Sequence, residues 1–171
     1  MAGIHHGFFG GIRQDFGDAR VLAKSNINQA SPPSIFKRYA FTPSLTIEAQ
    51  HPTNELALFS ISNNNVLKLS ENAPAPKPFL VFANITYDLP QGMYDTTNIK
   101  TEIVQVSPNN IETSLCVVYT LHYTFSLGLA TASLFGLGVL NRGEGLRIKS
   151  LLIDGSDEAV ILNASLLVVG E

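Results

Sequence analysis

The residues of this chain that could do chemistry are scattered, and none belongs to a complete catalytic motif. There is no G-x-S-x-G, H-E-x-x-H, G-x-x-x-x-G-K-[ST] or C-x-x-C pattern, and these patterns mark common nucleophile, metal and phosphate sites. His51 precedes a proline in a turn sequence, and His122 has no carboxylate near it in sequence. A solvated side chain is therefore favoured for His51, and a core or interface position for His122, over a role as a general base. We expect no enzymatic activity, no cofactor and no small-molecule substrate.

Two clusters could in principle hold a metal ion. The pair His5-His6 offers imidazole ligands, but a chain end supplies no fixed geometry. The run Asp154–Glu158 gathers carboxylate oxygens of the kind that calcium prefers. Its spacing does not match an EF-hand loop, and acidic turn tips are common. We expect no metal site.

The composition points to a globular chain with little polar cover. Apolar residues make up 45% of the 171 residues, whereas charged residues make up 15%, against about 25% in average domains. We infer that copies of the same chain or other proteins cover much of its surface. The net charge of −3 predicts no nucleic-acid partner. The single cysteine, Cys116, excludes an intramolecular disulfide and lies among apolar neighbours, which favours a buried thiol.

The segment Thr113–Asn141 contains no Asp, Glu, Lys or Arg. A membrane-spanning helix needs about 20 apolar residues, so the segment is long enough. However, residues 115–125 alternate with period two and are rich in β-branched and aromatic types, which is typical of a strand. The spacing of Gly128 and Gly136 resembles a membrane-helix dimer face, or else marks a hairpin bend with close packing between chains. We favour two strands in a hairpin over a membrane span.

Neither face of this expected hairpin shows a charge, although one face of a sheet in a small sandwich normally meets water. We therefore predict that the hairpin lies at a contact between subunits, near an oligomer axis. The alternative is an internal sheet covered by the N-terminal segment. The predicted contact residues are Leu121, His122, Tyr123, Phe125, Gly128, Ala132 and Leu134.

From residue 39 to residue 171 the pattern predicts an all-β domain. Turn clusters rich in Asn, Gly, Pro and Ser recur between runs of β-forming residues. The predicted strands are 41–49, 55–61, 66–70, 79–87, 99–106, 112–125, 131–140, 146–153 and 159–169. So many short strands favour an antiparallel β-sandwich, most of all an eight-stranded jelly roll. An immunoglobulin-like sandwich is the alternative, but the Cys…Trp…Cys pattern is missing.

Residues 1–38 differ from the rest because they are rich in glycine and contain Pro32-Pro33. Three aromatic residues, Phe8, Phe9 and Phe16, are too apolar for a free linker. We predict an extended N-terminal arm that contacts its own domain or a neighbouring subunit through them. A disordered tail is the alternative, and residues 15–23 could form a short helical turn.

The C-terminal region carries a resemblance to a known family. The run LNRGEGLRIKSL at residues 140–151, followed by NASLLVV at residues 163–169, resembles the last two strands of trimeric jelly rolls. C1q/TNF-like heads, phage fibre heads and small viral capsid proteins share this pattern. The resemblance implies a homotrimer around an apolar axis, and it assigns no functional residue.

These observations lead to two hypotheses about function. The first is a virion structural protein, a capsid or spike subunit that assembles with itself and with other structural proteins. The alternative is a C1q/TNF-like trimeric receptor- or carbohydrate-binding module, secreted or at the cell surface, with Tyr and Asn residues of the segment 88–98 as the ligand site. Two glycosylation triplets begin at Asn84 and Asn163. We expect both to be unused, because the first residues lack the pattern of a secretory signal.

Overall fold

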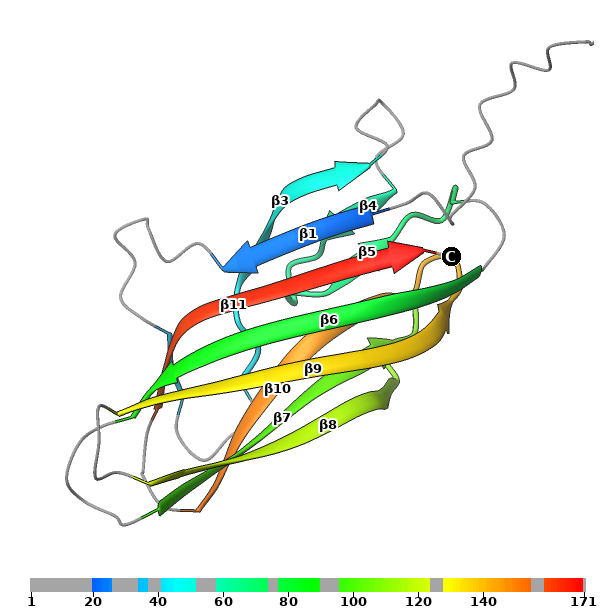
Figure 1. Cartoon of the computed structure of the whole chain (residues 1–171). Coiled ribbons are helices and arrows are strands. Elements are labelled where there is room, and N and C mark those ends of the chain that lie inside the picture. The colour runs from blue at the N-terminus through cyan, green and yellow to red at the C-terminus, as the bar shows by residue number, and fades with distance from the viewer. Residues whose placement is uncertain are drawn as a thin grey trace, which may run out of the picture.

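The protein is a sandwich of two antiparallel sheets, seen in the computed structural model (Figure 1). The structure describes residues 20–25, 34–36, 41–51, 58–73, 77–89, 96–123, 128–154 and 159–170. Within these ranges the chain forms strands and turns, and no helix in them is long and apolar enough to cross a membrane. The predicted fold class, an antiparallel β-sandwich of the jelly-roll type, is confirmed.

The first sheet, called sheet A, has the strand order β3–β1–β11–β6–β9, and β2 pairs with the beginning of β11. Its long strands β11, β6 and β9 run side by side across the middle of Figure 1. The strands are β1 (Arg20–Ser25), β2 (Ser34–Phe36), β3 (Leu45–His51), β6 (Lys77–Asp88), β9 (Leu129–Leu140) and β11 (Ala159–Gly170).

The second sheet, called sheet B, has the order β4–β5–β10–β7–β8. Its strands are β4 (Phe59–Ile61), β5 (Leu67–Leu69), β7 (Thr96–Val106), β8 (Glu112–Tyr123) and β10 (Gly145–Asp154). Each of the nine strands predicted from sequence has a counterpart in one of the two sheets. The turns use residues suited to left-handed backbone, since Asn65, Asn110 and Gly143 have φ angles of 56°, 60° and 76°.

The predicted division of the chain at residue 38 is wrong for the segment that forms β1. This strand lies between β3 and β11 in sheet A, and its residues Val21 and Ala23 are fully buried in the core. The predicted helical turn is therefore absent from residues 20–23. The run RVLAKS is too short for its alternation of apolar and polar residues to predict a strand, because only Val21 and Ala23 point inward. It becomes a strand by pairing with β11, which is far away in sequence.

The predicted hairpin of the uncharged segment is also wrong. β8 pairs with β7 in sheet B, whereas β9 pairs with β6 in sheet A. The chain therefore crosses from one sheet to the other between these strands. Both strands end the order of their sheets, and they lie next to each other at the same side of the sandwich (Figure 1).

The core lies between the inner faces of the two sheets. Alternate residues of each long strand point inward, as the burial pattern of β9 shows from Ala130 to Leu140. Tyr87 on β6 is fully buried, and its hydroxyl lies 2.7 Å from Thr101 Oγ1 on β7 and 2.8 Å from Ser150 Oγ on β10. Desolvation raises the pKa of Tyr87 above its ordinary value, so the phenol remains protonated and can donate. This group ties sheet A to sheet B.

Removing that hydroxyl should weaken the sandwich. Tyr87→Phe deprives the buried hydroxyls of Thr101 and Ser150 of a partner, and a buried polar group without its partner costs about 1–3 kcal/mol. We expect the free energy of unfolding, measured by urea denaturation, to fall by that amount. The triple variant Tyr87→Phe, Thr101→Val, Ser150→Ala removes all three polar groups together and should be closer to wild type. A single variant as stable as wild type would contradict this role.

Candidate self-association surface

The outward side of β11, β6 and β9 in sheet A carries almost no charge. Among the side chains that the structure describes there, Asp88 at the end of β6 is the one charged group. Charges on this face of the sheet lie instead on β1 and β3, where Lys24 Nζ and Glu48 Oε2 form an ion pair at 2.6 Å. The centre of the face is therefore made of apolar and neutral polar side chains.

The register between strands sorts these outward side chains into two halves. The apolar half has one row of Val169, Leu80 and Leu137 and a second row of Leu22, Leu167, Phe82 and Phe135. The polar half has one row of Ser165, Asn84 and Ser133 and a second row of Asn163, Thr86 and Thr131.

The apolar half exposes large side chains to solvent. Phe82 is 42% exposed, Phe135 is 51% exposed and Leu137 is 61% exposed. The rings of Phe82 and Phe135 contact each other across the two strands, with centroids 5.0 Å apart and planes inclined at 46°. Contiguous exposed apolar patches on soluble proteins mark interaction sites. None of the residues that form this patch on β6 and β11 was among the predicted contact residues.

The outer face of sheet B is different because ion pairs lie beside its exposed apolar side chains. Glu112 on β8 pairs with Arg147 and, at 2.6 Å, with Lys149 on β10. Lys100 Nζ and Glu102 Oε2 on β7 lie 3.1 Å apart. Burial lowers the pKa of Arg147, because its guanidinium loses solvation. Such a charged face suits contact with water, so the two outer faces of the sandwich differ in chemistry.

The predicted contact residues fall on different parts of the sandwich. Leu121 is 53% exposed on the outward side of β8, in line with Val117 and Tyr119. Ala132 and Leu134 instead point inward from β9 and are buried in the core of the same chain. Those two residues therefore do not lie on the outer surface, because the alternation of β9 places their neighbours Ser133 and Phe135 there.

For His122 and Tyr123 the structure describes the backbone, which is part of β8, while their side chains and the whole of Phe125 lie outside the described residues. The subunit contact itself stays a prediction.

Gly128 and Gly136 have reasons within the chain for being glycine. A Cβ atom at Gly128 would lie 2.3 Å from the carbonyl oxygen of Leu89, whose amide in turn donates to Gly128 O at 2.6 Å. At Gly136 a Cβ atom would lie 3.1 Å from Val81 and 3.6 Å from Cys116 of β8. The close packing predicted between chains at these glycines is thus found between strands of one chain.

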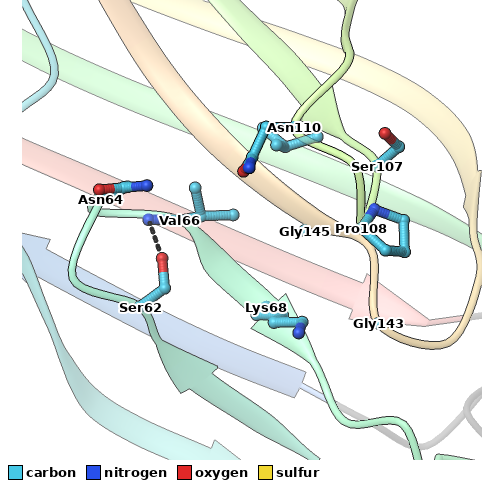
Figure 2. A pocket seen from close by; sticks show the side chains of 10 residues that line it. Ser62, Asn64, Val66, Lys68, Ser107, Pro108, Asn110, Gly143 and Gly145 are labelled. Atoms are coloured by element: carbon cyan, nitrogen blue, oxygen red, sulfur yellow. Dashed lines mark hydrogen bonds between the residues drawn. The ribbon is translucent and has the colours of Figure 1, made fainter.

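A small cleft opens at the end of the sandwich where three turns meet (Figure 2). It has a volume of about 130 Å³ and is lined by residues of the turns after β4, β7 and β9. Its polar groups are largely used by the turns themselves: Ser62 Oγ accepts from the Val66 amide, and Ser107 Oγ accepts from the Ile111 amide. Lys68 pairs with Glu71 at 3.5 Å. This arrangement stabilises the turns that line the cleft.

The remaining predicted sites lie mostly outside the described residues. This holds for the arm residues Phe8, Phe9 and Phe16, for the His5-His6 pair and for positions 155–158 of the acidic run. Most of the suggested ligand segment, residues 90–95, lies there too. Among the residues that are described, no group of His, Cys, Asp and Glu could hold a metal ion. Cys116 is half-buried and packs against the core, as predicted in part.

Comparison with known proteins gives a likeness of fold. No protein-family model matches the sequence, and no curated protein matches it. Among solved structures, the Eiger TNF from S. frugiperda superposes with a TM-score of 0.55 at 10% identity, covering 89% of this chain and 91% of the other. Murine APRIL superposes with a TM-score of 0.55 at 9% identity, covering 89% of this chain and 99% of the other.

These superpositions confirm the predicted resemblance to TNF-like jelly rolls and extend it from the C-terminal strands to most of the chain. At 9–10% identity the likeness concerns the fold alone.

The tight contact at Gly128 can be tested separately from association. Gly128→Ala forces a Cβ atom against the Leu89 carbonyl, and such overpacking typically costs about 1–3 kcal/mol. We expect a loss of unfolding free energy of that size, equal at low and high protein concentration. Ser133→Ala, an exposed change on the same strand, is the matched control for folding and should stay near wild type. If Gly128→Ala altered only the concentration dependence, Gly128 would be a contact between chains after all.

Proposed function

We propose that the protein is a self-associating, non-enzymatic binding head of the C1q/TNF-like type, assembled as a homotrimer. The observation that carries this proposal is the uncharged part of the outer face of sheet A on β11, β6 and β9, where the exposed rings of Phe82 and Phe135 contact each other. Exposed aromatic side chains without nearby charges are what the buried centre of a protein interface contains. The TNF-like fold and the sequence resemblance to trimeric jelly rolls support a trimer of this kind.

The position of the sheet edges supports a ring in preference to a face-to-face pair. β8 and β9 each end the strand order of their sheet, and both lie at the side next to the uncharged face. Val117, Tyr119 and Leu121 add exposed apolar surface along β8. In a cyclic assembly each copy contributes an edge to one neighbour and a face to the other. The exposed apolar residues of β8 and the uncharged face of sheet A are then both covered by a single type of contact.

A role in binding rather than catalysis is part of the same proposal, as is a place outside the cell or on its surface. Two hydroxyls of the cleft, Ser62 and Ser107, bind backbone amides of the turns that line it. The virion role favoured from sequence stays a prediction, since the likeness to TNF-type structures agrees better with the alternative.

A charge at the centre of the face should break the assembly. We expect Phe82→Asp and Phe135→Asp each to shift the protein from trimer to monomer, since losing a central aromatic contact costs about 2 kcal/mol or more. That cost corresponds to at least about thirtyfold in the dissociation constant. Light scattering coupled to size exclusion, over a range of concentrations, measures the mass in solution.

Ser60→Asp is the matched control, because Ser60 is exposed in sheet B opposite Lys68 and an added carboxylate there meets a cation. It should leave the trimer intact. A wild-type protein that stays monomeric at high concentration would overturn the proposal. A Phe135→Asp variant whose assembly keeps the wild-type mass would also overturn the proposal.

A truncation separates the binding head from the virion subunit. Removing residues 1–38 would also delete β1 with its buried Val21 and Ala23, so the deletion has to stop before Arg20. If the protein is a binding head, we expect wild type and the variant lacking residues 1–19 to form the same trimer and no larger particles. For a virion subunit, wild type would build larger particles that the variant loses. Electron microscopy and light scattering of both proteins decide between them.

A further inference from the structure

The small cleft between the turns lies on the outward side of sheet B. Lys68 on β5 pairs with Gly145 on β10, and Gly145 pairs with Val106 on β7, so the three residues form one row across the sheet. The adjacent pair, Leu67 and Leu146, points to the other side of the sheet and is buried in the core. The cleft therefore opens away from sheet A, and each copy in an assembly through sheet A presents its own cleft.

Gly145 leaves a gap in this row, where the cleft meets bare backbone. A Cβ atom at this position would overlap Val66 Cγ1 and lie 2.8 Å from the carbonyl oxygen of Leu67, so a larger residue fits only if β5 moves. Val66 and Val106 also line the cleft, and with Val104 they form a small buried apolar cluster apart from the main core. The cleft therefore has an apolar surface whose shape is fixed by the packing of β5 against β10.

The walls of the cleft carry groups that both donate and accept hydrogen bonds. Asn64 and Asn110 come from the turns on either side (Figure 2), and both are exposed. Within the part of the chain that the structure describes, no hydrogen bond engages either side-chain amide, and each amide offers two donors and an acceptor. The hydroxyls of Ser62 and Ser107 accept from turn amides but keep their own hydrogen to donate.

We propose that this cleft binds one acidic sugar residue at the end of a glycan, an inference that rests on the proposed role as a binding head. Sugar hydroxyls donate and accept at the same time, which matches the amides and hydroxyls of the walls. The apolar face of a sugar ring fits against Val66, Val106 and Pro108. The described lining contains no aromatic side chain, so it offers no stacking platform for a flat base.

The size of the cleft limits how much of a glycan can enter. Its volume of about 130 Å³ is below the roughly 300–1,000 Å³ of sites that enclose a drug-sized ligand. One terminal residue can therefore occupy it, while the rest of the glycan stays in solvent.

Lys68 selects a ligand that carries a carboxylate. Its ammonium group is the one charge among the described residues that line the cleft. Lys68 Nζ lies 3.5 Å from Glu71 Oε1, and the side chain of Glu71 is 79% exposed. Such exposed ion pairs contribute little to stability, so a ligand carboxylate can replace Glu71 as the partner of Lys68.

Binding can be measured by NMR on the full-length protein with ¹⁵N-labelled asparagine. The probes are the methyl glycosides of glucuronic acid, galacturonic acid and N-acetylneuraminic acid, with those of glucose and galactose as neutral counterparts. We expect at least one acidic glycoside to shift the side-chain amide signals of Asn64 and Asn110, and to leave those of Asn84 and Asn163 on sheet A in place. The neutral glycosides should bind at least about tenfold more weakly, because they lack the hydrogen bond to a charged group.

Three variants test the individual groups. Lys68→Met keeps the aliphatic stem and should weaken binding of the acidic glycoside about tenfold. Asn110→Gly suits the left-handed backbone at a φ of 60° and should weaken it about fivefold through the lost amide. Glu71→Gln releases Lys68 and should tighten binding about threefold. Asn65→Gly is the matched control, because Asn65 has a φ of 56° in the turn of Asn64 but does not line the cleft.

Each outcome decides the matter. Acidic glycosides that shift neither Asn64 nor Asn110 overturn the site, as does unchanged affinity in both Lys68→Met and Asn110→Gly. A neutral glycoside that binds as tightly as the acidic ones overturns the ligand class. The monomer expected from Phe135→Asp should bind the glycoside as tightly as the trimer does. A trimeric wild type without binding therefore overturns this inference alone, and a monomeric wild type that binds overturns only the proposed trimer.

Discussion

The close approach of β8 to β9, where the chain crosses from one sheet to the other, is the constraint on which the rest of the structure depends. Gly136 and Gly138 face inward on β9, and the β8 side chains of Leu115 and Cys116 lie over them. A Cβ atom at Gly138 would meet the ring of Phe79, its partner on β6, at 2.9 Å, so a larger residue would displace that buried ring. The missing side chains at these positions leave room for Phe79 of β6 and Leu115 of β8 on this side of the sandwich. The same closure brings β8 and β9, the end strands of the two described sheets, together.

The different chemistry of the two outer faces follows from where the chain places its few charges. Charged residues make up only 15% of the sequence, and in sheet B they form two groups, Glu112 with Arg147 and Lys149, and Lys100 with Glu102. The exposed apolar residues of β8 have these charges beside them. The centre of sheet A has no such neighbours, and desolvating it costs little because no ion there would lose its hydration. The part of the outer face of sheet A on β11, β6 and β9 is therefore the surface that is covered at the lowest cost.

The sequence predicts the strands well but their partners poorly. Turn residues such as Asn65, Asn110 and Gly143 mark the ends of strands through local backbone geometry, which needs no knowledge of the fold. Period two in residues 115–125 identifies a strand but does not say whether the next strand joins the same sheet. The sequence does not predict β1, because only its pairing with β11, about 140 residues later in the chain, identifies it as a strand. The rows of the candidate surface cross β11, β6 and β9, so they exist only once the register is known.

A face that is uncharged and also borders the end strands of both sheets is a hazard as well as the proposed means of assembly. Exposed edges invite further strands, and an apolar patch beside them would favour open-ended stacking. Three features of the described surface limit this: Asp88 at the end of β6, the Lys24–Glu48 pair on β1 and β3, and the polar half around Asn84. The first two place charge at the border of the face and the third breaks its apolar continuity. Because these groups leave the apolar half as an island, contact through it can be closed by a small ring and has little reason to continue into a fibre.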